Sequence, residues 1–190
     1  MVRSIPVATA VMVLAALLSA ATDKPPIYRN EEFGITLPVP DGALLCPNPD
    51  GEHDHGPVMV LNRFEAKGCN DAEGGRIIEV FASFNAMQAT KTLNKLLQSQ
   101  CIDIAKGKCQ SAPPQMTLKG LPSMSARVNR TDGWIDIFVV THAGKPDPAF
   151  DASVPSVNFV LWLHTRPEHM EKDLRVFRIV LETIRLSPAQ

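Results

Sequence analysis

The chain has 190 residues, with 19 lysines and arginines against 20 aspartates and glutamates, so its net charge at pH 7 is −1. No basic run or stripe appears along it, which argues against nucleic acid or anionic lipid as a partner. Hydrophobic residues make up 45% of the chain, and the length suits one domain with its own hydrophobic core.

The first 21 residues have the pattern of a secretory signal peptide. Arg3 supplies a positive charge, residues 5–18 are almost wholly apolar, and small residues stand at 19–21. We place the cleavage between Ala21 and Thr22. A membrane-spanning helix needs about 20 apolar residues, so the shorter run favours cleavage over a retained anchor. The sequence predicts a mature, soluble, monomeric domain at residues 22–190, periplasmic or secreted and without a membrane anchor.

The cysteines agree with export, because disulfides persist in oxidising compartments. Three pairings of the four are open. We favour Cys46–Cys69 and Cys101–Cys109, since each pair brackets a short loop-like stretch rich in proline, glycine and aspartate. In the chain-entropy view each bridge stabilises the fold by about 2–4 kcal/mol. A four-cysteine zinc site would need C-x₂₋₄-C spacing, which is absent.

In the first half of the chain, residues 22–30 read as a polar lead-in. Alternating apolar side chains then predict strands at 32–37, 58–63 and 76–84. The third of these is apolar on both faces, which indicates a strand in the middle of a covered sheet. One face carries Ile78, Val80, Ala82 and Phe84, and the other carries Ile77 and Phe81.

A helix is predicted next, with Asn85 as its N-cap. Its buried stripe has the spacing of one helix face and consists of Leu93, Leu96, Leu97 and Cys101. Residues 106–114 follow as a loop.

The second half begins with a predicted β-hairpin. Strands at 123–130 and 134–141 flank Thr131-Asp132-Gly133, and Asp-Gly between alternating runs is a strong hairpin signal. A strand at 157–164 follows, apolar on both faces. Pro167 opens the last helix, which ends at Ser187-Pro188. Its predicted buried stripe is Met170, Leu174, Phe177, Leu181 and Ile184.

This order predicts an α+β fold. Its hairpins favour a mainly antiparallel sheet of about six strands. Two long amphipathic helices cover the sheet, one on each side, as an α/β/α sandwich stabilised by disulfides.

Two segments carry a family resemblance. One is the strand of residues 28–38, which ends in proline, and the other is the strand 158–164 with the later segment 177–186. In these the chain resembles the PsbP-like and DcrB-like small exported domains. The resemblance implies an antiparallel sheet between helices. It also implies binding or assembly in the cell envelope or the thylakoid lumen more than catalysis, and it brings no catalytic residue.

The stretch at residues 48–56 has the densest set of metal-binding side chains. Glu52, His53, Asp54 and His55 place two histidines two residues apart with carboxylates beside them, as a divalent metal site requires. The twelve-residue calcium pattern fails, because its glycine falls on His53 and its final glutamate on Met59. A solvated turn is the competing interpretation.

Other catalytic patterns are weak. There is no G-x-S-x-G motif, and paired cysteines leave no thiolate. Three histidines stand isolated in the sequence, with His142 and His164 at strand ends and His169 in the first helical turn. Asp132 and Asp136 flank Trp134, and paired carboxylates can do acid–base work. A turn residue and its strand neighbour are the commoner explanation.

The sequence thus favours a non-enzymatic protein-binding module, such as a toxin-immunity or envelope assembly factor. Its loops at 46–57 and 143–156 are the expected contact surface, because loops carry function on a rigid scaffold. The protein partner stays unidentified, and no cofactor is expected. The alternative is a metal-binding periplasmic protein that uses residues 52–55.

Overall fold

The computed structural model describes residues 25–46, 49–50, 53–61, 68–69, 75–86, 89–112, 116–145 and 153–187. The predicted signal peptide lies outside these ranges. The described strands form a seven-stranded sheet, a three-stranded sheet and a two-stranded ribbon, and all pairings between these strands are antiparallel. The α+β class and the antiparallel sheet are confirmed, with one strand more in the main sheet than expected.

The main sheet has the order β3-β6-β7-β11-β10-β9-β8. Its strands are β3 (Ala43–Cys46), β6 (Val58–Leu61), β7 (Ile77–Phe84), β8 (Gln110–Ser111), β9 (Ser123–Asn129), β10 (Ile135–Ala143) and β11 (Val157–Thr165). The long central strands β7 and β11 are those whose sequences are apolar on both faces. Such strands need cover on both sides, and the structure supplies it.

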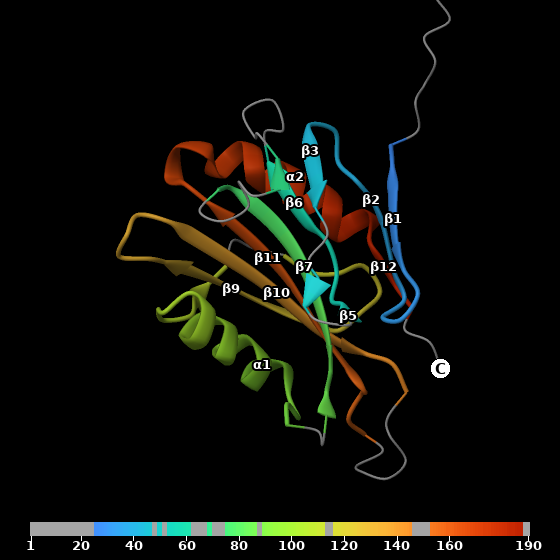
Figure 1. Ribbon diagram of the computed structural model, residues 1–190. Coiled ribbons are helices and arrows are strands. Elements are labelled where there is room, and N and C mark those ends of the chain that lie inside the picture. The colour runs from blue at the N-terminus through green and yellow to red at the C-terminus, as the bar shows by residue number, and fades with distance from the viewer. Residues whose placement is uncertain are drawn as a thin grey trace, which may run out of the picture.

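Two helices lie on opposite sides of this sheet (Figure 1). Helix α1 (Leu93–Ser99) continues into a π-helical turn at Gln100–Ile104. Helix α2 (Met170–Thr183) begins with a 3₁₀ turn at Pro167–His169. The sandwich is therefore confirmed, although α1 with its π-turn is shorter than the long helix expected.

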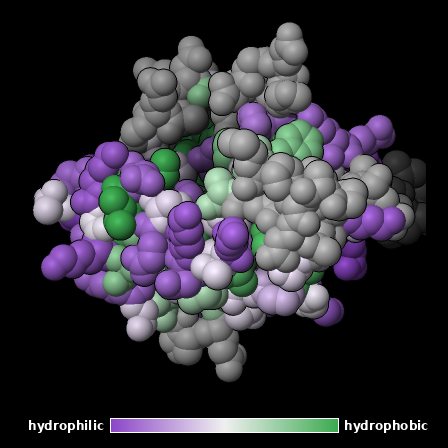
Figure 2. Space-filling model, turned by 90° about the horizontal axis from the view of Figure 1, so that it is seen from below, coloured by the Kyte–Doolittle hydropathy of each residue, from purple (hydrophilic) through white to green (hydrophobic). Residues whose placement is uncertain are grey.

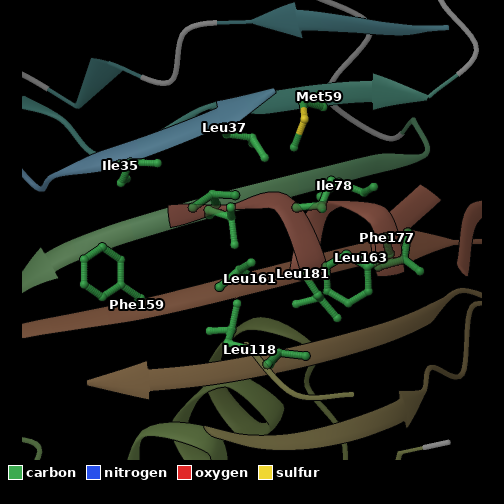
Figure 3. Close-up of a cluster of buried hydrophobic side chains, with 14 of the residues drawn as sticks. Ile35, Leu37, Met59, Ile78, Leu118, Phe159, Leu161, Leu163, Phe177 and Leu181 are labelled. Carbon is green, nitrogen blue, oxygen red and sulfur yellow. The ribbon is translucent and has the colours of Figure 1, made fainter. Parts of the chain in front are cut away.

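The larger core lies between the main sheet, α2 and the small sheet (Figure 3). The small sheet has the order β1-β2-β12, with β1 (Ile27–Asn30), β2 (Ile35–Pro38) and β12 (Arg185–Leu186). Side chains from all three parts meet in this core, among them Ile35, Leu37, Ile78, Leu161, Phe177 and Leu181. On the other side of the main sheet, α1 and the π-helical turn bury Leu96, Leu97 and Cys101 against β9, β10 and β11.

Several local predictions are wrong. The polar lead-in contains β1, and β3 was not expected at all. Helix α1 is capped by Thr92, whose side chain accepts a hydrogen bond from the Lys95 backbone N–H, and not by Asn85. Asn85 is buried, and its amide instead bonds the backbone of Thr90 and Pro155.

Helix α2 also ends earlier than predicted. Ile184 has an extended backbone, with ψ of 141°, and the next two residues form β12 against β2. The apolar periodicity continued through Ile184 because that side chain still enters the same core. Periodicity alone did not distinguish the last helical turn from a short buried strand.

A buried ion pair fixes α2 to the main sheet. The Arg76 guanidinium Nη1 lies 2.8 and 2.9 Å from the two carboxylate oxygens of Asp173. The Thr165 hydroxyl donates to the same carboxylate at 2.5 Å. The Asp173 side chain is only 2% exposed, so these contacts replace its lost hydration.

The two disulfides are Cys46–Cys69 and Cys101–Cys109, the pairing favoured from the sequence. Cys101–Cys109 ties the π-helical turn to the segment before β8. Within the described residues, no helix is both long and apolar enough to span a membrane.

Candidate functional site

The predicted metal loop is partly described. Glu52 and the side chain of His53 lie outside the described residues. Asp54 ends the ribbon of β4 (Pro49–Asp50) and β5 (His53–Asp54). Both of its carboxylate oxygens are occupied, because Oδ2 accepts from the Tyr28 hydroxyl at 2.6 Å and Oδ1 from the Gly56 N–H at 3.0 Å. Burial and this carboxylate raise the pKa of Tyr28 well above its usual value.

His55 occupies the edge of β7. Its Nδ1 donates to the Ala82 carbonyl at 2.6 Å, since a carbonyl oxygen only accepts. Its ring stacks between Phe33 and Phe81, with centroids at 5.6 and 5.0 Å. These contacts give His55 a role in packing, and Nδ1 is not available to a metal. Among the described side chains, no three histidines, cysteines or carboxylates converge. Metal binding by residues 52–55 stays a prediction.

A second group of polar side chains lies on the α1 side of the main sheet. The register of β10 and β11 places Asp136 directly opposite His164. Asp136 is fully buried, and its Oδ1 accepts from His164 Nδ1 at 2.6 Å and from the Trp162 indole N–H at 2.8 Å. The sequence had indicated an isolated His164, but the preceding strand β10 supplies Asp136 as its partner.

The hairpin between β9 and β10 closes over this group. The Trp134 ring stacks on His164 with centroids 4.2 Å apart, and the Arg166 guanidinium lies 4.0 Å from the Trp134 centroid. Arg130 binds the exposed Asp132 and comes within 3.7 Å of Asp136 Oδ2. Hydrogen bonding to Asp132 raises the pKa of Arg130, and the same bond lowers the pKa of Asp132. Asp132 is a turn residue, while Asp136 organises the buried cluster.

An apolar groove of about 260 Å³ lies next to this cluster, between α1 and the sheet. Its floor comes from β7, β10 and β11, and its wall from α1 and the π-helical turn. The lining residues are mostly hydrophobic, and they are Glu79, Phe81, Ser83, Leu96, Gln100, Ile104, Phe138, Val160 and Trp162. Such a concave apolar site with few polar groups is typical of ligand binding.

The strand register divides this face into cross-strand rows, because alternate residues of each strand share a face. The floor consists of two rows, one with Glu79, Trp162 and Phe138 and the next with Phe81, Val160 and Val140. A polar row bounds the floor at each end. One contains Asp136 and His164, and the other contains Ser83, Asn158 and His142. We call the second the serine–asparagine–histidine row.

The surface on the lower side of Figure 1 is shown in Figure 2. Its coloured part is mostly hydrophilic, and its hydrophobic residues form small separate patches. The described residues therefore present no broad apolar patch in this view. The groove is the better candidate for a specific apolar contact.

Sequence reasoning found the residues of this site but not the site. It placed His164 and His142 at strand ends and treated them as isolated. What it lacked was the register between β10 and β11, which no short turn determines. The alternation in each strand did indicate which residues share a face.

Comparisons with known proteins support the fold. No protein-family model matches the chain, and no curated protein matches its sequence. The chain is similar in structure to LpqN of Mycobacterium tuberculosis, a protein involved in cell envelope biogenesis, with a TM-score of 0.54 and 14% identity over 86% of this chain and 90% of that one. It is also similar to the cyanobacterial PsbP of Synechocystis sp. PCC 6803, with a TM-score of 0.51 and 14% identity over 92% and 99%. At this identity the likeness concerns the fold alone, and the PsbP-like fold predicted from the sequence is confirmed.

Proposed function

We propose that this protein is an exported, non-catalytic assembly factor of the cell envelope that binds a partner protein through the groove beside α1. The observation that carries the proposal is the groove itself, an apolar floor between two polar rows under a short helix. Protein partners commonly insert apolar side chains into such grooves.

Export is supported by the signal-peptide pattern and by two disulfides that reducing compartments would not preserve. The link to the envelope rests on the fold likeness to LpqN. A toxin-immunity factor would use the same kind of surface. The identity of the partner protein distinguishes an assembly factor from an immunity factor.

The proposed absence of catalysis rests on the chemistry of the Asp136–His164 pair. A histidine that acts as a base needs a nucleophile or a substrate within hydrogen-bond reach. Within the described residues, no serine, threonine or cysteine side chain hydrogen-bonds to His164, and Asp136 also holds Trp162. The pair is thus suited to positioning Trp162 in the groove floor.

Two isoleucines allow a matched test. Ile104 lines the groove and is 45% exposed, while Ile179 is 50% exposed on α2, on the other side of the main sheet. Ile104→Glu puts a charge into the groove, and Ile179→Glu makes the same change elsewhere. Both should leave the fold intact, because both side chains are already half exposed.

The experiment immobilises the mature protein and both variants and exposes them to periplasmic extract. We expect one protein to be retained by the wild type and by Ile179→Glu but lost with Ile104→Glu. Retention of no specific protein, or equal retention by all three, would contradict the proposal. The loops at 46–57 and 143–156, predicted to make contact, are only partly described and remain a prediction.

A further inference from the structure

A second cavity lies on the α2 side of the main sheet, away from the groove beside α1. Its volume is about 140 Å³, and it is enclosed by α2, the start of β3, the end of β6 and the residue that precedes β7. The lining residues are Asp41, Gly42, Ala43, Leu61, Arg76, Lys172, Asp173 and Val176. Half of them are charged, so the cavity suits a polar ligand.

The buried guanidinium of Arg76 is only partly used by the protein. Its side chain is 10% exposed, and Nη1 makes both bonds to the Asp173 carboxylate, at 2.8 and 2.9 Å. Nε and Nη2 donate to no described residue. These two nitrogens form one edge of the guanidinium, whose parallel N–H groups match the two oxygens of a carboxylate. Because buried donors in native proteins nearly always have acceptors, an open edge on a cavity-lining arginine points to an acceptor that a ligand brings.

Two oppositely charged side chains lie at the exposed rim of the cavity. Lys172 belongs to the first turn of α2, and Asp41 belongs to the turn at residues 40–43, in which the Ala43 N–H donates to the Pro40 carbonyl at 3.1 Å. Both charged side chains are exposed, and among the described residues neither forms an ion pair. Together with the buried arginine–aspartate pair they give two positive and two negative charges, so the cavity is neutral before a ligand enters.

This arrangement of charge selects a ligand that carries both signs. A phosphate dianion would add two negative charges close to Asp41 and Asp173, which repel it. A simple amine would leave the open edge of Arg76 without an acceptor. A ligand with one carboxylate and one ammonium supplies a partner to each and keeps the cavity neutral. A cavity of about 140 Å³ has room for several water molecules, so an amino acid of three or four carbons fits.

We propose that this cavity binds a small free amino acid as its zwitterion. The ligand carboxylate lies between the Nε–Nη2 edge of Arg76 and the Lys172 ammonium, and the ligand ammonium lies beside the Asp41 carboxylate. The hydrocarbon part contacts Leu61 and Val176, which also line the cavity. The inference is independent of the groove beside α1, because the two cavities share no lining residue and lie on opposite sides of the main sheet.

The test uses the mature, isotope-labelled protein and probes that differ by one charged group. L-Alanine, β-alanine and 4-aminobutyrate carry both groups at three separations, propionate carries only the carboxylate, ethylamine carries only the ammonium, and inorganic phosphate is the competing anion. Binding is followed by shifts of the backbone amide signals of Gly42, Ala43 and Ile77. We expect at least one of the three amino acids to bind about tenfold more tightly than propionate, ethylamine and phosphate, as one further charge-assisted hydrogen bond allows.

Three variants assign the contacts. Asp41→Asn should remove the preference for the amino acid over propionate, because it removes the partner of the ammonium. Lys172→Met should weaken the binding of both about tenfold, whereas Lys119→Met, an exposed lysine outside the cavity lining, should change neither. Arg76→Lys keeps a positive charge beside Asp173 but lacks the open edge, so it should abolish binding. The two rim variants, at exposed positions, still decide the matter if Arg76→Lys does not fold.

Several results would overturn the assignment. Equal binding of propionate and all three amino acids would identify a simple carboxylate site, and tighter binding of phosphate would identify a phosphate site. The assignment is also wrong if no probe shifts these signals at millimolar concentration, or if Asp41→Asn keeps the preference for the amino acid. The capture experiment with Ile104→Glu decides the proposed function separately, since it concerns the groove on the other side of the sheet.

Discussion

Replacing Asp136 removes the acceptor at the centre of the cluster beside the groove. Its Oδ1 accepts two hydrogen bonds, from the Trp162 indole and from His164 Nδ1, and the residue has no exposed surface. Asp136→Ala therefore leaves two donors without an acceptor. Asp136→Asn can keep both bonds, because an amide oxygen placed at the Oδ1 position still offers two lone pairs.

The two variants should differ clearly in stability. A buried donor left unpaired costs about 1–3 kcal/mol, so two donors give about 2–6 kcal/mol for Asp136→Ala. The lower half of this range applies, because Trp162 is only partly buried and water can reach it. Asp136→Asn loses only the charge-assisted part of two bonds and should cost about 1–2 kcal/mol.

Urea unfolding at neutral pH measures these differences, and the two tryptophans of the cluster supply the fluorescence signal. Asp132→Ala is the control, since it changes an exposed carboxylate on the same hairpin and should leave the unfolding free energy nearly unchanged. The reasoning is refuted if Asp136→Ala costs less than about 1 kcal/mol, or if it costs no more than Asp136→Asn.

Four further predictions concern other parts of the molecule. Asp173→Ala should destabilise the protein by about 3–5 kcal/mol because it leaves Arg76 buried without its partner, whereas Arg76→Met with Asp173→Leu should restore most of that loss in urea unfolding. Gly56→Ala should lower the Tm, because Gly56 has a φ of +125° and an added Cβ would lie 2.1 Å from a backbone carbonyl oxygen; an unchanged Tm would show that this close approach is not rigid. Burial lowers the pKa of His142 in the folded protein, so the unfolded chain takes up this proton at a higher pH than the folded protein does. The free energy of unfolding should therefore be at its full value above about pH 6.5 and decrease as the pH falls below it. His142→Gln should flatten this part of the profile of stability against pH. If residues 52–55 bind metal, isothermal titration with Zn²⁺ should give histidine-dependent, sub-micromolar binding, and no heat of binding would exclude that site.

Several elements could be predicted from the sequence because their causes are local. Asp132-Gly133 turns the chain within a few residues, and Gly133 adopts the positive φ, +83°, that this turn requires. The start of the last helix is also local, because the fixed φ of Pro167 suits the first turn of a helix. The disulfide pairing also followed from short separations along the chain, since each favoured pair closes its own loop.

Other predictions failed where a distant segment competed for the same groups. Asn85 has the chemistry of an N-cap, but Pro155, 70 residues away in the sequence, takes part of its hydrogen-bonding capacity. The short strands β1, β3 and β12 form because each pairs with a neighbouring strand. Their sequences contain too few residues to show the alternation of apolar and polar side chains that is typical of a strand.

The candidate site could be predicted from the sequence only in part. Alternation by itself determined that the strands at 76–84 and 157–164 are apolar on both faces and therefore need cover on both sides. Only the tertiary structure decided that Asp136 meets His164, and that Ser83, Asn158 and His142 form one row. The physical reason is that a connection of thirteen residues, 144–156, joins β10 to β11. A connection of that length does not set a register, so the packing of both sheet faces sets it instead.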